Sequence, residues 1–315
     1  MKLKDYNLEP IDIGSWCNYQ SYVDKEQIAL QRNNLIFTGL YNGEHEIKFI
    51  YTKKIDQLLK RIDDFRQDIR LENTETILED EIYYTTKIEG AKTTRKRTSE
   101  IHRGTVIVTK DSSYDDKMVK NAFDAVKLLN IIGSKEINTD ILVKVWNVLV
   151  EGVCDNESIR GDVYRTGDVE VGSHEGVPFQ DVPKLMNQWC FFYNSTMLDE
   201  KPFLKTMLLH YMFETIHPFC DGNGRMGRLL INNYLISRGI ETARAVSIST
   251  EIGKNRSKYD AAFVDAEDNL YQDCTPFLEY MLEMTMASYY NAREVQREAD
   301  KQKQDDGGHN GDDPR

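Results

Sequence analysis

The chain has 315 residues, which suits one large or two small domains, and it carries a net charge of −12 at pH 7 with an isoelectric point near 5.1. That acidic balance argues against a nucleic-acid surface, and no apolar run approaches the roughly 20 residues of a membrane helix. Five cysteines without paired spacing and an N-terminus without a signal-peptide core favour a reducing compartment, so we expect a cytoplasmic protein with no membrane partner.

Residues 1–70 are predicted to form a hairpin and a helix ahead of the main domain. Asn42-Gly43 is a hairpin turn signal between two apolar runs, at 35–38 and 47–50. An amphipathic helix follows, defined by apolar side chains at helical spacing: Ile55, Leu58, Leu59, Ile62, Phe65 and Ile69.

The rest of the chain is predicted to be one helical domain over residues 71–299. Apolar periodicity indicates further helices at 118–132, 139–150, 183–193 and 276–299. The polar, glycine-rich residues 300–315 are predicted to be a disordered tail. The expected fold class is therefore mostly α with two small hairpins.

A helix predicted at about 76–90 ends in an unusual way. Thr85 and Glu89 are four residues apart and share a helix face, and Gly90 suits the position just past a helix end. A carboxylate at a helix C-terminus is mildly disfavoured by the helix dipole, so we expect Glu89 to have a cationic partner. An ordinary exposed helix tail is the alternative, because this short pattern also occurs by chance.

A short hairpin is predicted around residues 164–178. Val169 and Val171 alternate with polar residues and are flanked by glycines. This segment includes Gly167, Asp168 and Glu170. A plain surface hairpin without a binding role is an equally good interpretation of each of these residues taken singly.

The most informative segment is residues 217–228, which we call the motif loop. It reads His-Pro-Phe-Cys-Asp-Gly-Asn-Gly-Arg-Met-Gly-Arg and lies between predicted helices at 207–216 and 225–237. Pro218 cannot continue the first helix, and Gly222 and Gly224 allow a ligand to approach the backbone closely. The loop therefore lies at a helix N-terminus, where free N–H groups and the helix dipole attract anions.

The side chains of the motif loop suit phosphate chemistry. Arg225 and Arg228 are three residues apart on one helix face and can grip neighbouring phosphates. Asp221 is a hard oxygen ligand suited to Mg²⁺ beside those phosphates, and His217 can take a proton near neutral pH. A helix-capping loop with surface arginines and a core histidine is the alternative, which the combination of all these parts makes improbable.

The motif loop resembles the Fic motif, His-Pro-Phe-x-Asp/Glu-Gly-Asn-Gly-Arg-x-x-Arg, at every defined position. Fic proteins mostly transfer AMP from ATP to a hydroxyl of a target protein. The resemblance implies that His217 is the base, that Asp221 holds Mg²⁺, and that Phe219 anchors the loop in the core. It also implies a set of triphosphate-binding residues, namely Gly222, Asn223, Gly224, Arg225 and Arg228.

Two upstream segments resemble further Fic elements. The segment from Thr85 to Gly90 is similar to the inhibitory helix of that family, whose glutamate pairs with the second motif arginine, here Arg228, in the space that the γ-phosphate needs. The predicted hairpin is similar to the flap that aligns the target as an added strand, which implies target positioning by Gly167, Asp168, Val169, Glu170 and Val171.

A third segment departs from the family pattern. Residues 255–263 are similar to the stretch that carries two tyrosines near the nucleotide base, but the second tyrosine is Asp260 here. Tyr259 is either a base-stacking residue or part of the core, and the choice of nucleotide is left open.

The favoured function is thus an autoinhibited protein adenylyltransferase with a Fic-type helical core, ATP as substrate and Mg²⁺ as cofactor. Its target would be a protein with a Tyr, Ser or Thr hydroxyl, AMP removal at the same site is conceivable, and a homodimer is common in the family. The alternatives are a regulatory protein that binds a nucleotide without transfer, and a transferase of another phosphate-containing group such as UMP or phosphocholine.

Overall fold

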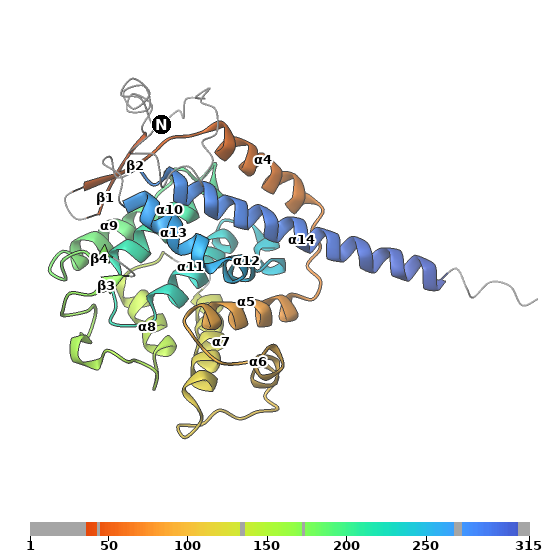
Figure 1. Cartoon of the computed structure of the whole chain (residues 1–315), viewed down its shortest axis with the longest axis horizontal. Coiled ribbons are helices and arrows are strands. Elements are labelled where there is room, and N and C mark those ends of the chain that lie inside the picture. The colour runs from red at the N-terminus through yellow and green to blue at the C-terminus, as the bar shows by residue number, and fades with distance from the viewer. Residues whose placement is uncertain (1–35, 43–44, 133–135, 172–173, 268–272, 308–315) are drawn as a thin grey trace, which may run out of the picture.

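Helices make up most of the chain in this computed structural model, which describes residues 36–42, 45–132, 136–171, 174–267 and 273–307 (Figure 1). The strands are β1 (Ile36–Asn42), β2 (His45–Phe49), β3 (Glu170–Val171) and β4 (His174–Glu175), which form two antiparallel hairpins. The helices of the first half are α4 (Lys53–Gln67), α5 (Thr74–Ile88), α6 (Arg95–His102), α7 (Tyr114–Ile132) and α8 (Thr139–Leu149). Those of the second half are α9 (Val182–Asn194), α10 (Pro202–Ile216), α11 (Asn223–Ser237), α12 (Ile248–Lys254), α13 (Arg256–Glu267) and α14 (Thr275–Gly307). The described residues also form two 3₁₀ turns, η1 (Glu157–Ile159) and η2 (Glu241–Ala245). The predicted mostly α fold class is confirmed.

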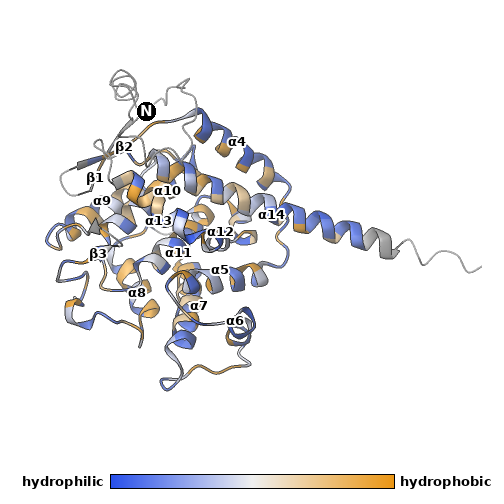
Figure 2. Cartoon of the chain, viewed as in Figure 1, coloured by the Kyte–Doolittle hydropathy of each residue, from blue (hydrophilic) through white to orange (hydrophobic). Residues whose placement is uncertain are grey.

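Helix α10 is the centre of the fold. All its residues from Phe203 onward are buried, as expected of a helix that is apolar on every side and packs against α9, α11 and α14 (Figure 2). The buried ammonium of Lys205 is satisfied by the Ser195 carbonyl at 2.5 Å and by Asp199 at 2.9 Å. None of the helices in the described part of the chain combines the length and apolar character that a membrane span requires.

The N-terminal hairpin and α4 are part of the same core. The pairing of Asn42 with His45 confirms the predicted hairpin, whose connecting residues 43 and 44 lie outside the described part. Helix α4 packs along α14 through Ile55, Leu58 and Ile62, and Thr52 caps it by accepting a 3.1 Å hydrogen bond from the Ile55 N–H. The chain therefore turns near the predicted boundary at residue 70, and the residues before and after it pack into one hydrophobic core.

The predicted tail at 300–315 is wrong in its first half. Helix α14 continues to Gly307, because no glycine or proline interrupts the polar helix-forming residues after 299. Asp300 also forms an ion pair of 2.8 Å with Arg70. The last residues, 308–315, lie outside the described part of the chain.

We predict that Ile62→Ala lowers the free energy of unfolding by about 2–5 kcal/mol, because the side chain is fully buried between α4 and α14. Urea unfolding followed by circular dichroism should show one transition at lower urea. The matched control is Ile131→Ala, whose side chain is 79% exposed and should change stability by no more than about 0.5 kcal/mol. A separate early transition in the Ile62→Ala variant would show that the N-terminal region unfolds on its own.

Candidate active site

The motif loop connects the end of α10 to the start of α11 through two left-handed residues. His217 terminates α10 with φ of 49°, and Gly222 precedes α11 with φ of 79°. A non-glycine residue at positive φ is strained and is held only where its surroundings demand it. The left-handed conformation of His217 thus ends α10 and begins the motif loop.

Packing from below holds the loop in this shape. Phe219 is fully buried and stacks on Trp146 of α8, with ring centroids 4.7 Å apart, as the Fic resemblance implied. The Trp146 indole N–H also donates to the Asp221 carbonyl at 3.0 Å. The ring stacking and the indole hydrogen bond therefore hold the motif loop against α8.

The Asn223 side chain holds the motif loop together. Its amide nitrogen donates to the Phe219 carbonyl at 2.8 Å, and its oxygen accepts from the Phe219 N–H at 3.0 Å. Each end of the amide can form a second hydrogen bond, so the contact of Asn223 with a triphosphate stays a prediction.

His217 is arranged as a proton acceptor. Its Nδ1 lies 3.3 Å from the Glu214 carbonyl, which can only accept, so Nδ1 carries the proton and the Nε2 lone pair is left for a substrate. Burial lowers the pKa of His217 to about 4 against its usual 6.5. The imidazole is thus neutral at pH 7.

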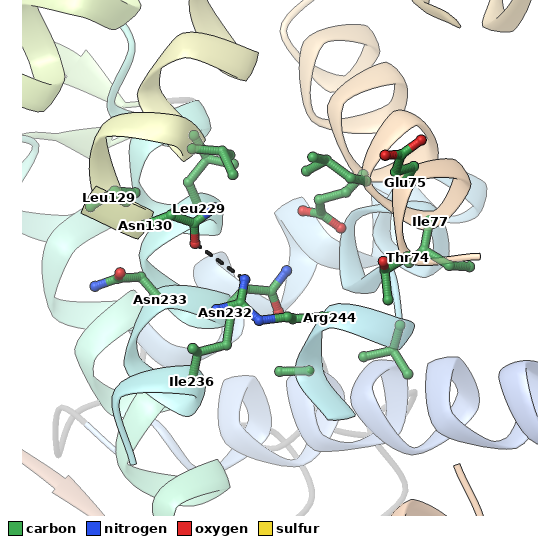
Figure 3. A pocket seen from close by; sticks show the side chains of 15 residues that line it. Thr74, Glu75, Ile77, Leu129, Asn130, Leu229, Asn232, Asn233, Ile236 and Arg244 are labelled. Atoms are coloured by element: carbon green, nitrogen blue, oxygen red, sulfur yellow. Dashed lines mark hydrogen bonds between the residues drawn. The ribbon is translucent and has the colours of Figure 1, made fainter. Parts of the chain in front are cut away.

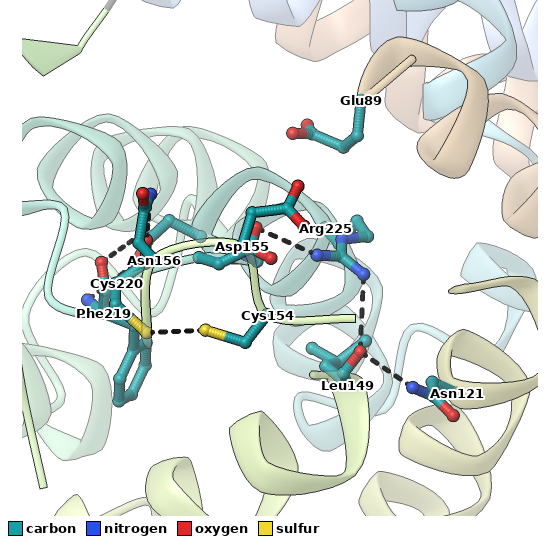
Figure 4. Close-up of polar contacts among 12 residues, drawn as sticks. Glu89, Asn121, Leu149, Cys154, Asp155, Asn156, Phe219, Cys220 and Arg225 are labelled. Carbon is teal, nitrogen blue, oxygen red and sulfur yellow. Dashed lines mark hydrogen bonds and ion pairs between the residues drawn. The ribbon is translucent and has the colours of Figure 1, made fainter. Parts of the chain in front are cut away.

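Asp221 and Arg225 form an ion pair of 3.1 Å at the base of the loop. Arg225 is almost fully buried and also donates to the Leu149 carbonyl at 3.4 Å (Figure 4). The second oxygen of Asp221, Oδ2, is buried and has no hydrogen-bond partner within the described residues. Among those residues, no cluster of three or more His, Cys, Asp or Glu side chains could hold a metal.

Arg228 is paired with the end of α5, as the sequence predicted. The guanidinium donates to Glu89 Oε1 at 2.5 Å, to Thr85 Oγ1 at 2.9 Å and to the Thr85 carbonyl at 3.2 Å. Partial burial raises the pKa of Glu89, but the charge and hydrogen bond of Arg228 outweigh it and hold that pKa below its usual value. The pair is therefore ionised at neutral pH.

The Glu89 carboxylate lies against Gly224, in the place where a ligand would approach the helix start. A Cβ at Gly224 would collide with Glu89 Oε1 and crowd the Arg228 guanidinium, so only glycine fits. The Glu89 side chain keeps 32% of its surface exposed, which leaves its outer face open to solvent. The glycine cradle of the motif loop is consequently filled by a carboxylate of the same chain.

Tyr259 belongs to the core and offers no surface for stacking on a base. It is 5% exposed, shares a 2.8 Å hydrogen bond with His210 and packs against Phe263 and Phe277. Of the two interpretations of Tyr259, the structure favours the core. The neighbouring Asp260 is exposed and lies 3.6 Å from Arg256.

A buried polar cluster of Tyr259, His210 and Glu214 lies directly under the motif loop. Burial lowers the pKa of His210 to about 3 and raises that of Glu214 to about 8, so both groups are neutral at pH 7. Glu214 Oε1 and His210 Nδ1 are in close reach of Gly227, where a larger residue would collide with them. No local sequence pattern indicates this cluster, because its members are spread over α10 and α13.

The predicted hairpin is confirmed as β3 and β4, with Glu170 paired to Glu175. The Gly176 N–H donates to the Val169 carbonyl at 2.8 Å, and Asp168 accepts from the Phe179 N–H at 3.0 Å. Gly167 is packed so closely on Ile159 that a side chain would not fit. Target alignment by Gly167, Asp168, Val169, Glu170 and Val171 stays a prediction.

Arg165 joins the hairpin to the motif loop, and the sequence analysis assigned it no role. It is 2% exposed, and its guanidinium donates to the carbonyls of His217 at 2.8 Å and Gly167 at 2.7 Å, and also to that of Val177. Its backbone N–H donates to the Pro218 carbonyl at 2.9 Å. In sequence, only its place just before the hairpin distinguishes this arginine from a surface one.

A hollow of about 170 Å³ lies away from the motif loop, beside the first half of α5 (Figure 3). It is lined by residues of α5, α7, α11 and η2, including Ile77, Leu129, Asn232 and Arg244. Glu89 and His217 do not line it, so this hollow is separate from the candidate active site.

The chain resembles known proteins in the region of this loop. Residues 136–235 match the family model described as Fic/DOC family. This segment contains the whole motif loop and the hairpin, whereas Thr85, Glu89 and Tyr259 lie outside it. This part of the chain is therefore similar to a Fic domain.

Two curated proteins that are similar to this chain bear the name protein adenylyltransferase Fic. The protein of Nematostella vectensis is 28% identical over 250 residues, which are 73% of this chain and 56% of that protein. The protein of Drosophila ananassae is 28% identical over 207 residues, which are 65% of this chain and 39% of that protein. The chain thus spans roughly half the length of the curated relatives it matches.

Solved structures of Fic family proteins share the fold of this chain. A Fic family protein from Desulfovibrio desulfuricans G20 has a TM-score of 0.67 at 24% identity, over 79% of this chain and 76% of that one. Fic-1 from C. elegans has a TM-score of 0.64 at 20% identity, over 78% of this chain and 73% of that one. The helical core with its hairpin is therefore a Fic fold.

We predict that Arg165→Lys loosens the hairpin, because a lysine ammonium cannot reach three separate carbonyls in the plane of a guanidinium. Hydrogen exchange of residues 167–177 should become at least about tenfold faster, which corresponds to a loss of about 1.4 kcal/mol of local stability. Arg297→Lys, on the exposed part of α14, is the matched control. Unchanged exchange in the hairpin would contradict the role of Arg165.

We predict that His217 stays neutral, with its proton on Nδ1, from pH 8 down to pH 5. A lowered histidine pKa means that the charged form is disfavoured, so the ring gains its second proton only as the pH falls toward about 4. Imidazole ¹⁵N shifts measure both the tautomer and the midpoint, and His217→Ala identifies the signal. A midpoint near 6.5, or a proton on Nε2, would count against the geometry described.

Proposed function

We propose that this chain is a protein adenylyltransferase that transfers AMP from ATP to a hydroxyl of a target protein. The observation that carries the proposal is the position of a neutral, Nδ1-protonated His217 beside an anion cradle at the start of α11. A protein that only bound a nucleotide would have no need of that base. The names of the curated relatives support the same activity.

In the proposed reaction, the target hydroxyl approaches His217 from the side of the hairpin. Nε2 takes the hydroxyl proton as the oxygen attacks the α-phosphorus of ATP, and pyrophosphate leaves. The N–H groups at the start of α11, with Arg225 and Arg228, hold the phosphates and stabilise the charge that develops on them. Catalysis thus consists of positioning and charge stabilisation with one proton transfer.

We further propose that Asp221 holds Mg²⁺ when ATP is bound. Its buried Oδ2 has no hydrogen-bond partner among the described residues, which suits a metal ligand. Because this is one carboxylate, the remaining ligands would be phosphate oxygens and water, as is usual for Mg²⁺. The ion would supply positive charge to the phosphates.

The chain is proposed to inhibit itself through α5. The Glu89 carboxylate occupies the cradle at Gly224 and uses the guanidinium of Arg228 that a γ-phosphate would need. ATP and Glu89 thus compete for the same cation, and ATP held without Arg228 would be badly aligned for attack. Glu89 would be the group that sets the activity, since its removal frees both the cradle and Arg228.

We predict that Glu89→Gly raises the transfer of labelled AMP to the protein itself by at least about tenfold, as expected when a competing hydrogen bond to a charged group, worth about 1.5–3 kcal/mol, is lost. Glycine is tolerated at the end of α5, so the variant should fold. Adding His217→Ala to it should abolish transfer. Labelling is measured with α-labelled ATP, UTP, GTP and CTP in parallel.

Glu72→Gly, on the exposed segment before α5, is the matched control and should leave labelling at its basal value. Equal labelling of the wild-type protein and the Glu89→Gly variant would rule out the inhibition. Preference for UTP, GTP or CTP would point to a transferase of another group, consistent with the departure at Asp260. No labelling by any of the four would favour a nucleotide-binding protein without transfer.

A further inference from the structure

The side chains of two cysteines, one of them in the motif loop, lie next to each other in the fold. The Sγ atoms of Cys154 and Cys220 are 3.1 Å apart, although the residues are 66 positions apart in the chain (Figure 4). Cys220 belongs to the motif loop, and Cys154 lies in the segment 150–156 that follows α8. We call these two side chains the thiol pair.

The segment that carries Cys154 is already bound to the motif loop by other contacts. The Asn156 amide donates to the Cys220 carbonyl at 3.0 Å, and the Val150 side chain lies against Gly222. The two sulfurs are therefore kept close by the folded backbone on both sides. Their encounter costs little further entropy, which makes a bond between them far more favourable than between two free thiols.

The two thiols differ in access. Cys220 is 4% exposed, whereas Cys154 is half-buried and can meet a molecule from solvent. Cys190 and Cys274 are buried elsewhere in the core. Among the cysteines of the described residues, Cys154 is therefore the one that an oxidant reaches first.

We propose that the thiol pair is a redox modification site, in which Cys154 and Cys220 form a reversible disulfide with a small disulfide oxidant such as glutathione disulfide. The modification joins the segment 150–156 covalently to the motif loop. Formation of the disulfide requires neither nucleotide binding nor the transfer reaction.

The reaction is a double thiol–disulfide exchange. The Cys154 thiolate attacks one sulfur of glutathione disulfide, forms a mixed disulfide and releases one glutathione thiolate. Cys220 then loses its proton to water and attacks Cys154 Sγ, which forms the Cys154–Cys220 bond and releases the second glutathione. Two protein thiols are oxidised and one glutathione disulfide is reduced to two glutathione molecules.

The cross-link reaches the catalytic residues through Asp221. To bond, the two sulfurs must approach each other by about 1 Å, and Cys220 is the immediate neighbour of Asp221. A displacement of that size in a phosphate site can lower a rate by about 100-fold. This consequence, unlike the cross-link itself, rests on the proposed transfer function, and we expect at least a tenfold loss of labelling.

The test uses the full chain with Cys17→Ser, because Cys17 lies outside the described residues, and with Glu89→Gly to allow labelling. The protein is incubated with glutathione disulfide, digested without reduction and analysed by mass spectrometry. We expect a peptide that joins Cys154 to Cys220, lighter than its two parts by two hydrogens, and its disappearance with dithiothreitol. Self-labelling should fall with cross-linking and return on reduction.

Cys154→Ser in the same background is the matched control, and its labelling should not respond to glutathione disulfide. Absence of the joined peptide at both pH 7 and pH 9 would overturn the proposal. A joined peptide with undiminished labelling would overturn its effect on Asp221. If no variant labels under any condition, the proposed function fails, while the peptide measurement still decides whether the thiol pair is a redox site.

Discussion

A buried guanidinium at Arg228 needs an anion beside it, because the desolvation of an unpaired charge costs several kcal/mol. In the structure that anion is Glu89, from a helix 139 residues earlier in the chain, with Thr85 as a second acceptor. The same cation, at the start of α11, suits a phosphate group equally well. One charge requirement therefore links α5 to the motif loop.

The motif loop can keep its strained shape because the structure below and beside it is rigid. The buried helix α10 ends at His217, the stacked rings of Phe219 and Trp146 set the depth of the loop, and the guanidinium of Arg165 joins the loop to the hairpin. These contacts come from α8, α10 and the segment before β3. His217, the start of α11 and the hairpin are thereby held together by packing and hydrogen bonds.

Much of this arrangement could be predicted from local patterns. The mostly α fold, both hairpins, the helix that ends near Glu89 and the pairing of Glu89 with Arg228 were predicted from periodicity, turn residues and a family resemblance. The predictions that the structure changed involve contacts between distant residues. Tyr259 could have faced a base or the core, and it lies in the core because His210 and two phenylalanines surround it. Helix α14 extends beyond 299, and Arg70 pairs with Asp300 there.

By itself, the sequence determined which residues could carry the chemistry, because a histidine, a carboxylate, glycines and two arginines at a helix start act through local backbone geometry. Only the tertiary structure decided which partners each of these side chains contacts. It gave His217 its tautomer through the Glu214 carbonyl, and it joined Arg165 to the hairpin and the loop. It also brought Cys154 against Cys220 and placed Glu89 in the cradle at Gly224. These outcomes depend on burial and on distances between segments far apart in the chain, which no local pattern of residues records.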